Sequence, residues 1–255
     1  MSTRIAAIAV ATFKEALRDR LLVLVVVFAV AMVLFSRVLG WLSVEDEVKM
    51  VHDFSLTGMS FLSLFLAMLV GASSLAREVE RRTVYTVLTR TGTRTEFILG
   101  KFVGLVGVFW LCLLGAGLVL ALWVLTWGGS IGEALVAAMI GLMLEAIVLT
   151  AVALFLGALA APAIASVGTF AFYLIGHGTE ALRELTDQGK NPDFAAVYSV
   201  LYRVLPNLEN VNFINATTSG RPVDWGALGA GALYVLCWTS VLLAGAIILF
   251  RKRQF

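Results

Sequence analysis

The chain has 255 residues, of which 60% are hydrophobic and only 14% charged, and its mean hydropathy is +0.94. An average soluble domain carries roughly a quarter charged residues, so this balance excludes a disordered chain, a coiled coil and nearly every soluble fold. The apolar residues form long blocks rather than short alternating strands, which argues against an outer-membrane barrel. The composition therefore predicts an all-α integral membrane protein. Its two cysteines, Cys112 and Cys237, lie in apolar blocks and give no disulfide framework and no metal-binding spacing.

Several apolar blocks are long enough for a membrane-spanning helix, which needs about 20 residues. The stretch Ile131–Ile175 contains only two charged residues, Glu133 and Glu145, and has the length of two spans joined by a tight turn. Gly157 and Pro162 are the expected breakers in that stretch. Six spans in a single domain over residues 1–255 are therefore predicted. They are Leu21–Leu42, Phe54–Ala76, Leu99–Trp127, two within Ile131–Ile175, and Ala227–Phe250.

The basic residues are shared unevenly between the two sides of this predicted membrane domain. Most of the 19 lysines and arginines lie before the first span, between spans two and three, or after the last span. Short loops rich in Lys and Arg stay in the cytoplasm. Both termini and the segment 77–100 are therefore predicted to be cytoplasmic, and the segment 176–226 external.

The first 20 residues have the pattern of an amphipathic helix. We expect this helix to lie in the membrane interface with its arginines toward anionic headgroups, although a simple cytoplasmic lead-in is the alternative. The apolar residues predicted to share one face are Ile5, Ile8, Ala9, Phe13, Ala16 and Leu17.

The external segment 176–226 contains two further predicted helices. Thr179–Gln188 is short and polar, and the amphipathic, aromatic-rich Phe194–Leu205 carries an apolar stripe that includes Phe194, Tyr198 and Leu201. Asn191 and Pro192 suit the start of the second helix. This helix is expected to lie on the bilayer or to cap the spans, as an external gate or as a structural lid.

Several catalytic motifs are missing from the sequence. It has no zinc motif of the form HExxH and no phosphate-binding loop of the form GxxxxGK[ST]. His177 and Glu180 could supply two metal ligands, but no third accompanies them. The sequence therefore predicts no catalytic residue, no metal site and no nucleic-acid partner, and any ATP hydrolysis must come from another polypeptide.

Glu145 is the outstanding residue inside the predicted membrane domain. A carboxylate near the middle of a bilayer is costly and usually marks a pathway or a contact with a partner group. Two interpretations stay open for it: a functional proton site, or a protonated side chain hydrogen-bonded to a neighbouring helix. The first would suit a proton-coupled carrier or a membrane-embedded enzyme.

The stretch from Glu78 to Leu88 reads EVERRTVYTVL, and Arg94, Glu96 and Leu99-Gly100-Lys101 follow it. This pattern resembles the permeases of ABC transporters of the type-2 export class, which carry a similar motif between their second and third spans. The chain is most similar to the short permeases related to nitrous-oxide reductase maturation. It departs from the usual pattern at Arg82 and at Thr91-Gly92, where the family often has glycine and proline.

The resemblance implies that this cytoplasmic segment is a coupling helix seated in a groove of a separate nucleotide-binding ATPase subunit. Its charged side chains would pair across the interface, and its apolar ones would anchor it. The coupling residues implied in this way are Arg77, Glu78, Glu80, Arg81, Arg82, Thr83, Tyr85 and Leu88.

The resemblance also implies an assembly. The chain would be the membrane subunit of an ATP-driven exporter in the cytoplasmic (inner) membrane of a bacterium or archaeon, surrounded by membrane lipid. A second permease copy would complete it, as a homodimer rather than a heterodimer, and a periplasmic partner is a further option. ATP and magnesium would bind the partner subunit, and this chain would hold no cofactor.

Overall fold

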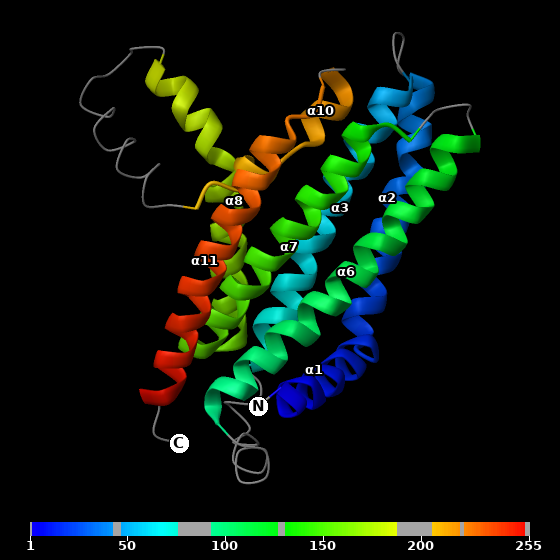
Figure 1. The fold of residues 1–255 in the computed structure, drawn as a ribbon. Coiled ribbons are helices and arrows are strands. Elements are labelled where there is room, and N and C mark those ends of the chain that lie inside the picture. The colour runs from blue at the N-terminus through cyan, green and yellow to red at the C-terminus, as the bar shows by residue number, and fades with distance from the viewer. Residues whose placement is uncertain are drawn as a thin grey trace.

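The computed structural model describes residues 2–42, 47–75, 93–126, 131–187, 206–219 and 222–252 (Figure 1). Helices make up nearly all of these ranges, and no β-strand occurs within them, which confirms the predicted all-α class. The α-helices are α1 (Ser2–Leu17), α2 (Arg20–Leu42), α3 (Glu47–Phe65), α6 (Arg94–Thr126), α7 (Glu133–Leu159), α8 (Pro162–Asp187), α10 (Ile214–Ser219) and α11 (Trp225–Lys252). A π-helical turn, η1 (Leu66–Gly71), continues α3, and a 3-10 turn, η2 (Leu208–Val211), precedes α10.

Four described helices are long and apolar enough to cross a membrane: α3 with its continuation to Leu75, α6, α7 and α11. The helices α1 and α2 meet at a bend of 66°. They would add a fifth membrane-spanning segment if the two together form one span. These helices indicate a multi-pass membrane protein. The helix α8 occupies the position of the predicted fifth span, but its apolar run ends at Ile175 and more polar sequence follows. The count of six spans stays a prediction.

The helix α7 lies at the centre of the bundle, in contact with α3, α6, α8 and α11. Its sequence is apolar on every side and rich in alanine, which is typical of a helix surrounded by other helices. In Figure 1, α2 and α6 lie on one side of α7, and α8 and α11 lie on the other side. A polar side chain in the middle of α7 must therefore find its partners inside the protein.

The predicted break within 131–175 is confirmed, and proline makes it. The helix α7 ends at Leu159, Ala160 is extended, and Pro162 begins α8 at the position where its missing N–H costs nothing. Gly157 was expected to help break the helix but lies within α7. A Cβ at Gly157 would come 2.9 Å from the carbonyl oxygen of Ala72, so this glycine lets α7 approach the end of α3.

The helix α8 continues without a break to Asp187, so the prediction of a separate helix beginning at Thr179 is wrong. Gly176 and Gly178 are both helical. Gly176 makes room for a neighbour, because a Cβ there would lie 2.7 Å from the side chain of Leu208. The predicted helix Phe194–Leu205 lies outside the described residues.

The helix α1 packs along the first part of α6. A Cβ at Gly100 would lie 2.6 Å from the Cβ of Ile8, and one at Gly104 would lie 2.6 Å from the carbonyl oxygen of Ala9. The predicted apolar face of α1 therefore meets α6 instead of lying free on lipid, although Leu17 at its end is exposed. Small residues on α6 allow this close contact.

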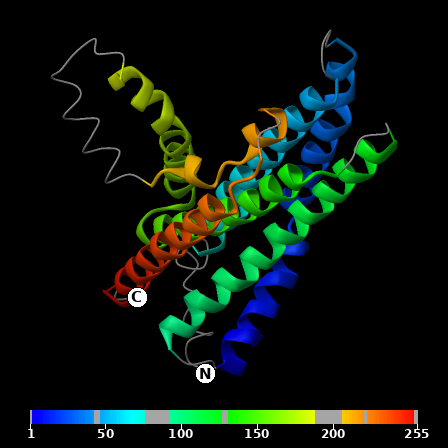
Figure 2. The ribbon, with the colours of Figure 1, turned by 45° about the horizontal axis from the view of Figure 1, so that its top comes forward.

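The starts of α1 and α6 and the ends of α3 and α11 gather at one end of the bundle, here named the termini end (Figures 1 and 2). The segment 76–92 joins α3 to α6 at this end. The helix α10 lies at the other end, here named the α10 end. Which end faces the cytoplasm stays a prediction.

Candidate functional sites in the middle and at one end of the bundle

Glu145 lies close to the middle of α7, and its side chain is only 4% exposed. The hydroxyl of Ser60 on α3 donates a hydrogen bond to Glu145 Oε1 over 2.9 Å. The same hydroxyl lies 2.7 Å from that of Tyr173 on α8. Glu145 thus lies in a hydrogen-bonded contact between three helices, α3, α7 and α8. Burial of a polar group without a hydrogen-bond partner is costly, and these partners avoid that cost.

His177 follows Tyr173 by one helical turn on α8 and links Glu145 to a second carboxylate. Its Nε2 lies 3.7 Å from Glu145 Oε1, and its Nδ1 lies 2.8 Å from Glu209 Oε1. The ring also packs 4.4 Å, centre to centre, from the ring of Tyr173. We name Ser60, Glu145, Tyr173, His177 and Glu209 the polar cluster.

Glu209 reaches the polar cluster because η2 enters the bundle between α7, α8 and α11. Glycine on each of these helices makes room for the turn. The three contacts join Gly141 to Val211, Gly176 to Leu208 and Gly231 to Asn210. The turn η2 thus packs against α7 near Glu145. The external location of segment 176–226 stays a prediction.

Asn207 fixes the turn that carries Glu209. Its side-chain oxygen accepts hydrogen bonds from the backbone N–H of Glu209, over 2.9 Å, and from the hydroxyl of Thr179, over 2.8 Å. Its own N–H donates to the hydroxyl of Tyr234 on α11 over 2.8 Å. The side chain of Asn212 donates to Glu209 Oε2 over 2.9 Å. Every one of these bonds holds Glu209 in one orientation against His177.

A second constellation lies at the termini end, where α6 begins. The N–H of Thr93 donates to Glu96 Oε2 over 3.0 Å, and the hydroxyl of Thr93 accepts from the N–H of Glu96 over 3.4 Å. This reciprocal pair is a capping box, which satisfies N–H groups that the helix itself leaves unpaired. It fixes where α6 starts, directly after the segment 76–92.

Two cations of α6 bind the ends of two other helices. Lys101, 2% exposed, donates from Nζ to the carbonyl oxygen of Ser74 over 2.9 Å. Arg94 donates to the carbonyl oxygens of Phe250 and Arg251 over 2.9 and 2.8 Å. Cations are favourable beside the unpaired carbonyls at helix C-termini. The ends of α3 and α11 are therefore tied to the start of α6.

A single element, α3 with its continuation, connects these two constellations. It carries Ser60 at the polar cluster and Ser74 at the bond with Lys101, and the π-helical turn η1 lies between them. The hydroxyl of Ser166 on α8 donates to the carbonyl oxygen of Met68 within η1, over 2.7 Å. π-helical turns are frequent at functional sites.

Glu145 is thus the one predicted site residue for which the structure gives a setting. The predicted coupling residues Arg77, Glu78, Glu80, Arg81, Arg82, Thr83, Tyr85 and Leu88 lie outside the described residues, as do the predicted gate residues Phe194, Tyr198 and Leu201. Among the described residues, no group of three or more His, Cys, Asp or Glu is arranged to hold a metal ion.

Comparison of the chain with models of protein families found none that matches, and comparison with curated proteins found no match either. The class that the described helices define is that of a multi-pass helical membrane protein. Within that class, the resemblance to exporter permeases depends on the residues of this chain alone.

Proposed function

We propose that the chain is the membrane subunit of an ABC exporter, working with a separate ATPase subunit that docks on the segment Arg77–Leu88. The observation that supports this most is the bond between Lys101 and Ser74, which ties together the two helices that flank this segment. A force on the segment would reach α3 and α6 together, and Arg94 would pass it to α11. A loop that only set topology would need no such attachment.

The mechanism follows from these attachments. Closure of two ATPase subunits on ATP and magnesium would pull the segment, and α3 would carry the displacement past η1 to Ser60 and the polar cluster. Such coupling needs an element with two states that the two sites bias differently. The π-helical turn supplies a candidate, because its wider winding can revert to the ordinary helical one.

The same proposal places the chain in a bacterial or archaeal cytoplasmic membrane, with six spans and both termini in the cytoplasm. A second permease copy would face the first, as a homodimer, and the predicted external gate of Phe194, Tyr198 and Leu201 would control the exit. The substrate would leave the complex on that external side, where a periplasmic partner would also meet it.

The coupling segment is tested by copurification from the native membrane. We expect a nucleotide-binding subunit to accompany the wild-type chain and to be lost from the double variant Glu80→Arg with Arg82→Glu. The matched control is Lys14→Glu with Glu15→Lys, an exchange of two exposed charges on α1. Equal retention of the subunit by all three proteins would contradict docking on this segment.

The polar cluster supports a second candidate function, a proton-coupled carrier or membrane-embedded enzyme centred on Glu145. His177 and Glu209 extend the buried carboxylate of Glu145 into a chain of titratable groups. The short turn η2, which carries Glu209, packs against α7, α8 and α11 beside these groups. This function requires Glu145 to change protonation and requires no ATPase. Abolition of uptake or efflux by a protonophore, without any nucleotide-binding partner, would favour it over the exporter.

A further inference from the structure

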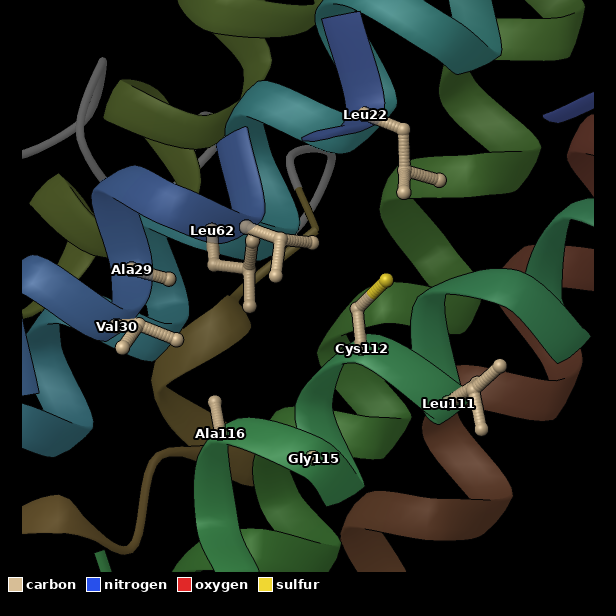
Figure 3. A pocket seen from close by; sticks show the side chains of 9 residues that line it. Leu22, Ala29, Val30, Leu62, Leu111, Cys112, Gly115 and Ala116 are labelled. Atoms are coloured by element: carbon tan, nitrogen blue, oxygen red, sulfur yellow. The ribbon is translucent and has the colours of Figure 1, made fainter. Parts of the chain in front are cut away.

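An apolar groove of about 390 Å³ lies between α2, α3 and α6, and nothing in the proposed function uses it (Figure 3). Its volume falls in the range of about 300–1,000 Å³ that is common for small-molecule sites. Leu22 and Val30 on α2 lie across the groove from Cys112 and Gly115 on α6, and Val26 also lines it. Its lining is entirely apolar apart from the thiol of Cys112.

The side chains leave real space beside α6. A Cβ built on Gly115 would meet no atom within 4 Å, whereas one on Gly100 or Gly104 would collide with α1. A void of this kind forfeits dispersion contacts along its lining, and an apolar cavity does not hold water. An apolar occupant would therefore be stabilising.

The groove opens toward lipid. Large apolar side chains beside it are exposed on both helices, for example Val23 and Val27 on α2 and Leu111 and Leu114 on α6. Exposed apolar side chains on membrane-spanning helices face acyl chains. The molecule with the easiest access to the groove is therefore a lipid of the surrounding bilayer.

The dimensions and depth of the groove fit one acyl chain. The nine residues from Leu22 to Val30 cover roughly 12 Å of helix axis, eight rises of about 1.5 Å. This compares with about 15 Å for half of the hydrocarbon core of a bilayer. Leu22 lies only two residues after the start of α2. With α1 in the membrane interface, as its amphipathic sequence predicts, the groove would begin close to the membrane surface and run inward.

Positive charge surrounds the shallow end of the groove. Lys14, Arg18 and Arg20 are exposed at the bend between α1 and α2. Asp19 accepts a hydrogen bond from the N–H of Leu21 over 2.9 Å and thereby caps α2, which leaves Glu15 as the exposed carboxylate of residues 14–20. Basic side chains at this depth attract anionic headgroups.

We propose that the groove is a binding site for an anionic phospholipid. One acyl chain lies along α2 between Leu22 and Val30, and the phosphate meets Arg18 and Arg20 at the bend. The site depends on the location of these helices in a membrane and is independent of whether an ATPase drives the protein.

The test measures phospholipid bound to the purified protein by native mass spectrometry, with phosphatidylglycerol and phosphatidylcholine as probes. We expect wild-type protein to retain phosphatidylglycerol, and Gly115→Leu to bind it at least about tenfold more weakly because leucine fills the groove. The control is Gly229→Leu, which adds the same side chain at an exposed glycine of α11 with no atom nearby. Equal binding by all three proteins would overturn the site.

A second variant distinguishes the contribution of the lipid headgroup to binding from that of the acyl chain. Replacing both arginines, Arg18→Gln with Arg20→Gln, should remove the preference for phosphatidylglycerol over phosphatidylcholine and leave binding of the acyl chain. An unchanged preference would overturn the assignment of the phosphate to the bend.

The thiols of wild-type protein provide a measurement that needs no variant. Cys112 lines the groove, whereas Cys237 is exposed on α11. Added phosphatidylglycerol should slow the reaction of Cys112 with a membrane-permeant maleimide several-fold and leave that of Cys237 unchanged. Equal effects on both thiols, or a Cys112–Cys112 disulfide between two copies in lipid, would contradict a lipid occupant.

Discussion

The Nζ of Lys101 and the carbonyl oxygen of Ser74 lie 2.9 Å apart, and this bond joins the start of α6 to the end of α3. The 17 residues between these helices, 76–92, include the whole predicted coupling segment. The described residues on either side of it, up to Leu75 and from Thr93, therefore belong to helices that this bond joins. Through this bond, docking of a partner on the segment would move α3 and α6.

Lys101→Met tests the bond between α6 and α3. Methionine keeps the apolar stem but removes the cation, so the carbonyl of Ser74 loses its donor. We expect destabilisation of about 1.5–3 kcal/mol, the usual worth of a hydrogen bond from a charged group. Thermal unfolding in detergent measures it, with Lys14→Met on the exposed side of α1 as control. Equal melting temperatures for the two variants would show that the bond stabilises nothing.

Replacements of Glu145 distinguish the two candidate functions. Glutamine can still accept the hydrogen bond from Ser60, but its amide cannot be reversibly protonated as a carboxylate can. An exporter driven by ATP should keep most of its activity as Glu145→Gln, whereas a proton-coupled carrier should lose it. Glu145→Leu should destabilise the protein by about 1–3 kcal/mol in either case, because polar partners are left buried. Transport in vesicles and thermal unfolding provide the two readouts.

A double-mutant cycle measures the contact between His177 and Glu209. We expect His177→Gln and Glu209→Gln to be non-additive, with a coupling of about 0.5–3 kcal/mol, because the two groups lie within hydrogen-bond distance. The control cycle pairs His177→Gln with Glu133→Gln at the exposed start of α7. Those two changes should add within about 0.5 kcal/mol. Coupling of equal size in both cycles would contradict a direct contact.

Two glycine replacements that should change the stability of the protein in opposite directions test the packing of η2 into the bundle. Gly141→Ala should destabilise the protein, because its methyl group would collide with the carbonyl of Val211. Gly178→Ala on α8 meets open space and should stabilise by about 0.5–1 kcal/mol, since alanine favours a helix. Melting temperatures that rise in both variants would show that η2 does not rest on Gly141.

The all-α class and most helix boundaries could be predicted, because long apolar blocks and Pro162 are local signals. Glu145 could be singled out for the same reason, as a carboxylate in an apolar block. Its partners could not. Ser60, Tyr173 and His177 are ordinary residues until three helices bring them together.

Glu209 was missed because no periodicity marks a short turn that enters a bundle. The one signal for it in the sequence is the placement of glycines on α7, α8 and α11, and glycines in spanning helices suit close helix packing equally well. Gly141 and Gly231 instead face backbone carbonyls of residues 210 and 211. The function of a glycine in a spanning helix thus depends on whether a helix or a turn lies against it.

The most direct test of the central claim is the ATPase activity of the complex purified from native membranes through a tag on this chain. The proposal predicts that a nucleotide-binding subunit copurifies and hydrolyses ATP with magnesium. It also predicts that Lys101→Met retains the subunit but uncouples hydrolysis from transport. A preparation that transports its substrate with no nucleotide-binding subunit would contradict the exporter, and Glu145 would then be the place to look for a proton-driven mechanism.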